Sequence, residues 1–517
     1  MGANIAAKFA DRRAHGPEAL VGLGLGANAA WVSMAFKSLT LYGNVSAEGG
    51  SEPVLDAVYL ISIVTVCITL CIAAAAERRT WQALAHFPTF LALALGTAII
   101  TVFLPLGNPA GSELQQVILM VTGVLSGAFS GLYLIYFGIA VSQLPLSGKV
   151  MASAVATIFS SLLFVVFNIL HADFAILLAA SMAPLSAALT TAGMSRAPLE
   201  GGSVPSPEPG QNLGFPGNFA TAVLRSKPSP IARENERRAW RGLVGRITAA
   251  SLLVGFASES SRTIYMQMDL VSAGQYAYAA VQAIDSLIAT VAVVALALLL
   301  LARRTERMAK DCYFAICLLL TLGVMLLPAP GLVPGVDSFI PLAISSAAYS
   351  AFGMFIWILT ACICSSFPQA TIAAFATIRA AWALGPLLGI VLGRAVLSGA
   401  GLNPTGIYVV TLCAIVALVV VSTFVFSSEA LGKIMAIVPT RTQQRFRHKC
   451  SLVAQRFGLT DRETEIMMML AKGRNLPFIQ EQLYLSKSTV STHRQHIYQK
   501  TGVHSQQELI DLVQEAE

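Results

Sequence analysis

The sequence has 517 residues, of which 55% are hydrophobic and only 12% are charged, about half the charged fraction of an ordinary soluble domain. This low charged fraction and the mean hydropathy of +0.68 exclude a soluble globular protein of usual composition. They predict a chain that is mostly embedded in a membrane. The formal net charge of +7 is modest, so the placement of the charges is more informative than their sum.

Residues 1–430 are predicted to form about twelve membrane helices, each with the roughly 20 apolar residues that a hydrocarbon core of about 30 Å requires. The expected ranges are 18–41, 53–76, 86–106, 116–142, 148–170, 172–193, 243–268, 275–302, 312–329, 338–365, 370–393 and 405–427. Gly, Ala and Ser are frequent in these ranges, as in MASAVATIFSSLL. Small residues allow membrane helices to pack closely, because lipid provides no hydrophobic drive for their association.

The loops between these helices fall into two classes by charge. With the N-terminus in the cytoplasm, the inner segments contain Lys8, Arg12, Arg13, Arg78, Arg79, Lys149, a basic run from Arg196 to Arg241, Arg303, Arg304, Arg307, Lys310 and the residues from Lys433 onward. The outer loops, such as YGNVSAEGGSEP and PAPGLVPGVDS, contain no Lys or Arg. This asymmetry follows the positive-inside rule, and an even number of crossings then predicts both termini in the cytoplasm.

A segment rich in Pro, Gly and Ser divides the membrane region into halves at 1–193 and 242–430, with a cytoplasmic linker at 194–241. Two sets of six spans around a long inner loop resemble the major facilitator architecture. The motifs AERRT, at the end of the second expected span, and ARRT, at the end of the eighth, are a weak internal repeat. The Gly- and Asp-containing motif that facilitators carry after their second span is absent, which argues against active transport but not against the fold.

Ionisable side chains inside the expected spans identify a candidate ligand site. Charged groups at membrane depth cost free energy and usually face a partner or a cavity. The four candidates are Glu259, Arg262, Asp285 and Arg379, with Tyr265 and Trp382 as aromatic neighbours. Lys37 and Arg394 lie near outer helix ends, from which long side chains reach water. The alternative is an ion-pair network that fixes helix packing and binds no ligand.

Beyond residue 430 the apolar runs stop. Residues 431–457 are expected to form a basic, amphipathic connector, and residues 458–517 a soluble domain of four helices. The boundaries of these helices are marked by capping boxes, by glycines at helix ends and by a proline suited to a first turn. The residues concerned are Thr460 with Glu463, Gly473, Pro477, Ser486, Gly502, and Ser505 with Glu508.

The apolar positions of this domain predict one small core. Its members are Ile466, Leu470, Ile479, Leu483, Leu485, Val490, Ile497, Val503, Leu509 and Leu512. Two short helices joined by LYLSKS form a helix-turn-helix, whose second helix enters the DNA major groove. Residues 440–517 contain 11 Lys or Arg and 8 Asp or Glu, a mild positive excess that favours a specific DNA-binding protein over a nonspecific one.

The segment LTDRETEIMMMLAKGRN…IQEQLYLSKSTVSTHRQHIYQKTGVHS resembles the DNA-binding domain of the LuxR family of bacterial transcription regulators over about 55 residues. Two positions depart from that family. Leu476-Pro477-Phe478 replaces a polar triplet before the second helix, and Ser491 replaces a frequent Lys. The first change adds an apolar patch, and the second removes a cation from the groove-facing side.

The resemblance implies which side chains contact DNA. Ser491, Thr492 and Gln495 would face base edges, and Gln can bond adenine through two hydrogen bonds. The expected phosphate contacts are Lys487, Thr489, His493, Arg494 and Lys500. The alternative is that these are ordinary solvated residues of an exposed helix.

Together these features predict an all-α, membrane-bound one-component transcription regulator, located in the bacterial inner membrane with both termini cytoplasmic. It would sense a small molecule through its membrane region and bind double-stranded promoter DNA as a homodimer. The sequence contains no motif of an enzyme, a cofactor or a metal site. The alternative function is a facilitator-type transporter with a DNA-binding or interaction tail.

Overall fold

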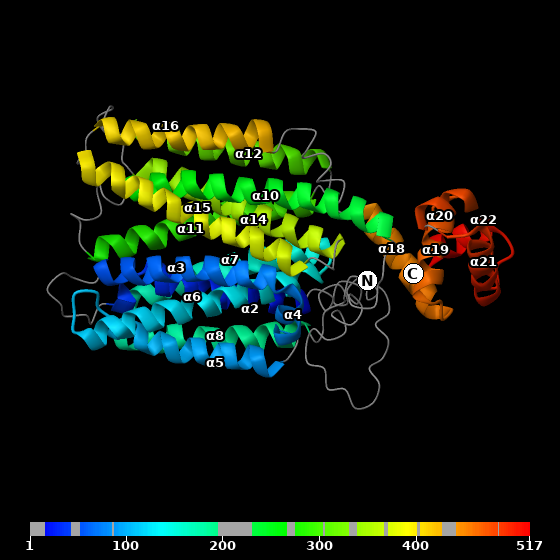
Figure 1. Cartoon of the computed structure of the whole chain (residues 1–517), viewed down its shortest axis with the longest axis horizontal. Helices are drawn as coiled ribbons and strands as arrows, with labels where there is room; N and C mark the ends of the chain where they lie inside the picture. The colour runs from blue at the N-terminus through cyan, green and yellow to red at the C-terminus, as the bar shows by residue number, and fades with distance from the viewer. Residues whose placement is uncertain are drawn as a thin grey trace, which may run out of the picture.

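The computed structural model describes residues 16–42, 52–84, 87–194, 230–265, 275–302, 306–329, 339–366, 371–400, 404–425, 441–483 and 485–516. Within these ranges every regular element is a helix, as predicted. Figure 1 shows long, roughly parallel helices and, beyond one end of them, a separate group of shorter helices. Of the expected linker at 194–241, residues 195–229 lie outside the described residues.

The membrane region consists of two sets of six long helices. The first set is α2 (Gly16–Lys37), α3 (Glu52–Ala75), α5 (Phe87–Phe103), α6 (Glu113–Ser142), α7 (Leu146–Ile169) and α8 (Ala172–Met194). The second is α10 (Pro230–Tyr265), α11 (Gln275–Ala302), α12 (Glu306–Met325), α14 (Phe339–Ser366), α15 (Thr371–Ala400) and α16 (Pro404–Val420). Each of these twelve helices overlaps one of the twelve predicted ranges.

Ten of the twelve helices are long and apolar enough to cross a membrane by length and composition. The other two are α10 and α12. The apolar part of α10 is interrupted by Glu259 and Arg262, and α12 begins with the charged sequence ERMAKD. Of these two helices, α10 carries two of the predicted site residues.

The two sets of six helices repeat the same packing pattern. In the first set, α2 packs against α7 and α8, α3 against α6, and α5 against α8. The equivalent pairs of the second set are α10 with α15 and α16, α11 with α14, and α12 with α16. The halves meet chiefly where α3 contacts α15 and α7 contacts α11. This repetition supports the duplicated architecture more firmly than the AERRT and ARRT motifs do.

Close helix packing depends on glycine, as the abundance of small residues predicts. Gly385, Gly389 and Gly393 recur every fourth residue along α15 and face α10. A Cβ on Gly389 would lie 2.7 Å from the carbonyl oxygen of Phe256. In α2, a Cβ on Gly24 would lie 2.1 Å from the hydroxyl oxygen of Thr190 in α8. Both contacts are possible only because the glycine lacks a side chain.

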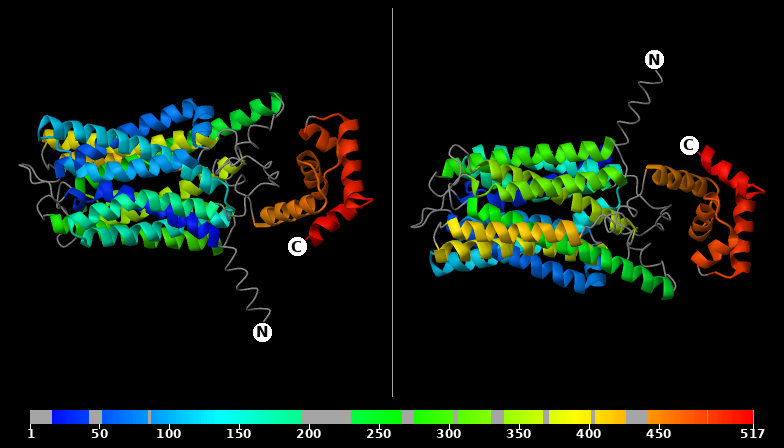
Figure 2. Two further views of the ribbon diagram at one scale, coloured as in Figure 1. Left: turned by 90° about the horizontal axis from the view of Figure 1, so that it is seen from below. Right: turned by 90° about the horizontal axis from the view of Figure 1, so that it is seen from above.

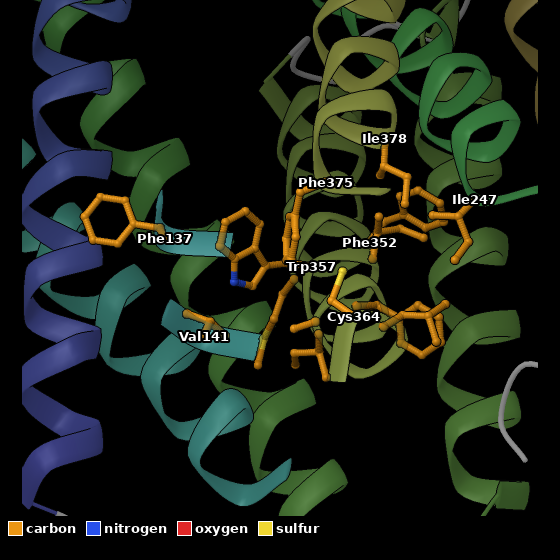
Figure 3. Packing of buried hydrophobic residues seen from close by; sticks show 14 of the residues in the cluster. Phe137, Val141, Ile247, Phe352, Trp357, Cys364, Phe375 and Ile378 are labelled. Atoms are coloured by element: carbon orange, nitrogen blue, oxygen red, sulfur yellow. The ribbon is translucent and has the colours of Figure 1, made fainter. Parts of the chain in front are cut away.

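One apolar core extends across the interface between the halves. Trp357 of α14 packs edge-on against Phe375 of α15, with ring centroids 5.4 Å apart. Figure 3 shows Phe137 and Val141 of the first half on the other side of Trp357. The four side chains belong to a single buried cluster, so the two halves are held together by apolar packing as well as by polar contacts.

The C-terminal helices form a separate unit with a core of its own. They are α18 (Arg441–Arg456), α19 (Asp461–Ala471), α20 (Leu476–Leu483), α21 (Lys487–Thr501) and α22 (Gln506–Glu515). The last four correspond to the four predicted helices. Figure 2 shows the five helices as a compact group distinct from the long ones.

Three features differ from the sequence-based expectation. A short helix that was not predicted, α4 (Glu77–Leu84), follows α3. Helix α10 begins at Pro230, inside the expected linker, because a proline suited to the first turn precedes a run of helix-forming Ala, Arg and Glu. Helix α18 lies within the expected connector, yet its Cys450, Val453 and Ala454 are buried in the core of the C-terminal unit.

Candidate DNA-binding domain and transmembrane polar cluster

The fold of the C-terminal unit positions α21 for contact with a partner. Val490 and Ile497, which lie two turns apart, are fully buried in the core shared with α19 and α22. This fixes which side of α21 points inward and leaves the opposite side to solvent. Helix α20 packs against α21, so these two short helices make the predicted helix-turn-helix.

The ends of these helices are capped as the sequence predicts. The Thr460 side chain accepts a hydrogen bond from the Glu463 amide, and the Glu463 carboxylate accepts one from the Thr460 amide. Ser486 caps α21 by accepting from the Thr489 amide. Gly473 and Gly502 adopt φ angles of 76° and 74° after α19 and α21, a left-handed conformation that side chains disfavour. The loops between the helices are therefore specified locally.

One contact that secures the turn after α19 was not predicted. The Gln506 amide of α22 donates hydrogen bonds to the carbonyl oxygens of Leu470 (2.9 Å) and Arg474 (3.0 Å). These bonds add to the backbone bond that the Gly473 amide donates to the Leu470 carbonyl oxygen, so α22 helps to hold the turn. A glutamine in a polar sequence gives no signal of this role, because the role depends on how α22 folds back over α19.

The predicted DNA-contacting residues differ in how far their side chains are exposed to solvent. Along α21 the exposed ones are Lys487, Thr492, Gln495 and Lys500, and the half-buried ones are Thr489, Ser491, His493 and Arg494. Ser491 and Gln495 are four residues apart and share one face of the helix. The Thr492 hydroxyl donates to the Ser488 carbonyl (3.0 Å), and the Arg494 guanidinium lies 5.9 Å from the centroid of the Tyr498 ring.

Lys500 differs from the other predicted phosphate contacts because the protein already engages its ammonium group. Its Nζ donates to the Glu463 carboxylate at 2.7 Å and to the Gly458 carbonyl at 3.3 Å. Burial opposes ionisation of Glu463, but the hydrogen bonds from Lys500 and Thr460 outweigh it and hold the pKa of this carboxyl below its ordinary value. Any phosphate bound by Lys500 would therefore share the ammonium with Glu463.

The Glu463 carboxylate is expected to make the stability of the C-terminal unit pH-dependent. A lowered pKa in the folded state means that the stabilisation is present at neutral pH and is lost as the pH falls below about 4. We expect Glu463→Gln to cost about 1 kcal/mol at pH 7, the usual value of a cap, and less at pH 3.5. Urea unfolding of residues 441–517 at both pH values measures this difference.

Glu481→Gln, on the exposed side of α20, is the matched control and is expected to change the unfolding free energy little at either pH. An equal cost of Glu463→Gln at both pH values would show that the carboxylate charge has no part in stabilising the fold.

In the membrane region, the structure brings together three of the four predicted site residues. The Arg262 Nη1 lies 2.8 Å from the Glu259 Oε1 within α10. The Asp285 Oδ2 of α11 accepts a hydrogen bond from the Ser346 hydroxyl of α14 at 2.8 Å. Asp285 also interacts electrostatically with Arg262 and Glu259. These residues form a polar cluster between three helices of the second half.

Lys37 of α2 joins this cluster from the first half. It interacts electrostatically with Arg262, Glu259 and Asp285. The sequence indicated only a long side chain reaching water at the outer end of a helix. The Lys37 side chain is exposed, and its charge also interacts with the cluster.

The fourth predicted residue, Arg379 of α15, has a different environment. Its Cζ lies 4.2 Å from the centroid of the Trp357 ring and 5.7 Å from that of Trp382. Tyr349 stacks on Trp382 with ring centroids 4.7 Å apart. Tyr349 also interacts electrostatically with Arg379, Arg262 and Glu259. The expected aromatic neighbour Trp382 is therefore present, while the Tyr265 side chain lies outside what the structure describes.

Sequence reasoning missed Tyr59, Ser346, Tyr349 and Trp357 as members of this region. Tyr59 of α3 interacts electrostatically with Glu259 and Arg262 from across the interface between the halves. A tyrosine in a membrane helix is not unusual, so neither its type nor its spacing marks it. The charged residues were found because a charge in a lipid environment is rare.

Comparison with known proteins identifies the C-terminal unit. Residues 458–513 match the family described as "Bacterial regulatory proteins, luxR family". A segment of 86 residues is 38% identical to the Fimbriae Z protein of Salmonella typhimurium and covers 17% of this chain and 36% of that protein. A segment of 55 residues is 41% identical to the response regulator UvrY of Escherichia coli and covers 11% of this chain and 25% of that protein. The chain thus spans less than half the length of these relatives.

The membrane region is similar to solved transporters in fold. The proton:xylose symporter XylE aligns with a TM-score of 0.53 and 13% identity, over 82% of this chain and 98% of the symporter. The human organic anion transporter MFSD10 aligns with a TM-score of 0.52 and 15% identity, over 80% and 99% of the two chains. At this identity the likeness concerns the fold alone. The chain therefore combines a LuxR-type helix-turn-helix domain with a multi-pass membrane region of the major facilitator fold.

Proposed function

We propose that this chain, in which a LuxR-type helix-turn-helix domain follows a membrane region of the major facilitator fold, is a membrane-bound one-component transcription regulator. It resides in the inner membrane of a bacterium, with both termini in the cytoplasm. The membrane region senses a small molecule, and the C-terminal domain binds promoter DNA as a homodimer. LuxR-type domains act on DNA, and paired modules on two half-sites give specificity.

The observation that carries this proposal is the direction of the helices. In Figure 1, α16 ends at the same end of the bundle from which the N-terminal part of α10 projects. This is also the end where α4 and the charged segment ERRT lie. The positive-inside rule places such basic segments in the cytoplasm. The helix-turn-helix that follows α16 then shares a compartment with the chromosome.

The geometry of α21 supports the DNA-binding part. Its exposed side presents Lys487 at the first turn and Gln495 two turns later. Lys487 would bind a phosphate and set the register, while Gln495 would contact a base edge beside Ser491 and Thr492. Thr489, His493, Arg494 and Lys500 complete the proposed phosphate contacts.

Two substitutions on α21 distinguish these roles. We expect Lys487→Ala in residues 441–517 to lower the affinity for all duplexes by a similar factor and to reduce the salt dependence of binding, because one phosphate contact is lost. We expect Gln495→Ala to reduce the preference for the promoter over random duplex by about tenfold, since a base contact is worth about 1–3 kcal/mol. Fluorescence anisotropy with both duplexes at two salt concentrations measures both effects.

Gln499→Ala, also exposed on α21 and not among the proposed contacts, is the control and should bind like the unchanged fragment. Absence of any salt-sensitive preference for promoter DNA in the unchanged fragment would contradict the DNA-binding proposal. Equal losses on promoter and random DNA for both variants would contradict the assigned roles.

The sensing part rests on the polar cluster of Lys37, Glu259, Arg262, Asp285 and Arg379. These residues come from α2 in the first half and from α10, α11 and α15 in the second. A ligand that contacts both halves binds more tightly to one arrangement of the halves than to another. A conformational signal requires this difference in binding. The resulting change would alter the spacing or dimerisation of the C-terminal domains.

The fold likeness to XylE and MFSD10 favours one alternative, a transporter with a regulatory tail. Uptake by purified protein in sealed vesicles separates the two functions. Saturable binding without accumulation of the probe supports a sensor. Accumulation above the bulk concentration, driven by an ion gradient, would favour the transporter.

A further inference from the structure

Arg379, in the first third of α15, is a positive charge for which the described residues provide no carboxylate partner. Its guanidinium instead lies over the indole rings of Trp357 and Trp382. Such contacts recover part of the cost of removing the cation from water, but they do not neutralise it. Charges at membrane depth are generally paired or functional, so an anion at this position would supply the missing counter-charge.

The indole of Trp357 is a second unsatisfied group at the same place. The residue is only 6% exposed, and its Nε1–H has no acceptor among the residues that the structure describes. A buried donor without an acceptor costs about 1–3 kcal/mol. Arg379 and Trp357 are in direct contact, and both would gain from the same kind of group, a negatively charged hydrogen-bond acceptor.

The charged side chains around this position have a positive excess. Lys37, Arg262 and Arg379 contribute three positive charges, and Glu259 and Asp285 contribute two negative ones. The Glu259 carboxylate is already engaged by Arg262 at 2.8 Å. One positive charge therefore remains, and the residue without a carboxylate partner is Arg379.

Polar side chains connect this position to the outer end of the bundle. Lys37 is the last residue of α2 and is exposed. Tyr349 interacts electrostatically with Glu259, Arg262 and Arg379, and thus links the outer cluster to the guanidinium. In the outer cluster Lys37 and Arg262 balance Glu259 and Asp285, so the excess positive charge is that of Arg379, which favours an anion over a cation there.

We propose that Arg379, together with the indole N–H of Trp357, binds the carboxylate of a small organic anion, and that such an anion is the ligand of the membrane region. Its role as a signal rests on the proposed function, but its binding does not. A planar guanidinium matches a carboxylate through two hydrogen bonds. The adjacent aromatic rings suit a ligand with an apolar or aromatic body.

The test uses the full chain in lipid nanodiscs, with binding measured by isothermal titration. The probes are benzoate, acetate and indole-3-acetate, and the controls are benzyl alcohol and benzylammonium, which keep the ring of benzoate but carry no negative charge. We expect at least one carboxylate to bind saturably and neither control to bind. Arg379→Gln should weaken the binding of that carboxylate at least tenfold, and Arg379→Lys should weaken it less.

Two further variants complete the design. Arg394→Gln removes a cation from the same helix, where Arg394 pairs with Asp56 at 2.6 Å, and should leave binding unchanged. Trp357→Phe keeps a ring but removes the N–H, and should weaken binding even if Arg379→Gln does not fold.

Failure of all three carboxylates to bind, or equal binding by Arg379→Gln or Trp357→Phe and the unchanged chain, overturns the proposal. DNA binding by residues 441–517 is measured separately, so a negative result here is distinct from a failure of the regulator function.

Discussion

Gly389→Leu is expected to prevent the second half of the membrane region from folding. A Cβ at this position would lie 2.7 Å from the Phe256 carbonyl oxygen, 2.9 Å from the Ser260 amide nitrogen and 3.0 Å from the Ser260 hydroxyl. Two of these atoms are backbone, so α10 would have to move away from α15 along their whole contact. Membrane helices associate through close packing rather than the hydrophobic effect. Once α10 and α15 are separated, little therefore remains to hold them together.

The measurement is the fraction of full-length protein that elutes as a single species in size-exclusion chromatography after detergent extraction. We expect a loss of most of that species for Gly389→Leu. Gly245→Leu is the matched control, because a Cβ there has no atom within 4 Å among the described residues. Normal yield of the Gly389 variant would contradict the assigned packing of α10 on α15.

Ile497→Ala is expected to remove more than half of the stability of the C-terminal unit. Ile497 is fully buried in the core to which α18, α19, α21 and α22 contribute. Removing such a side chain costs about 3 kcal/mol, including the cavity left behind. A small domain has a total stability of about 5 kcal/mol, so about 2 kcal/mol would remain, and the variant would unfold at a much lower urea concentration.

Urea unfolding of residues 441–517, followed by circular dichroism, measures this effect. Gln499→Ala, on the exposed side of the same helix, should shift the midpoint little. A midpoint for Ile497→Ala within the error of that control would show that α21 is not held by this core.

The sequence predicts the fold well where a periodic or local signal exists. The twelve apolar segments each correspond to a helix, because the thickness of a bilayer sets a length that few other structures share. The caps at Thr460 and Ser486 and the glycines at 473 and 502 follow from the chemistry of helix ends. The start of α10 was placed too late, because its first turns are polar and an apolarity criterion does not detect them.

In the candidate sites, contacts within one helix could be predicted from the sequence, but contacts between helices could not. Glu259 and Arg262 pair within one helix, a contact that spacing alone predicts. The contact of Arg379 with Trp357 joins α15 to α14, and the interaction of Lys37 with Asp285 joins opposite halves. Such pairs depend on how helices pack in space. The same limit applies to Lys500, whose bond to Glu463 links α21 to α19.

The central claim is that a protein embedded in the membrane binds specific chromosomal sites through its C-terminal domain. Chromatin immunoprecipitation of the full-length chain from intact cells tests it most directly, with a chain ending at residue 440 as the control. We expect a small number of enriched sites that disappear in the truncated chain and are reduced by Lys487→Ala. A full-length profile that cannot be distinguished from that of the truncated chain would contradict it.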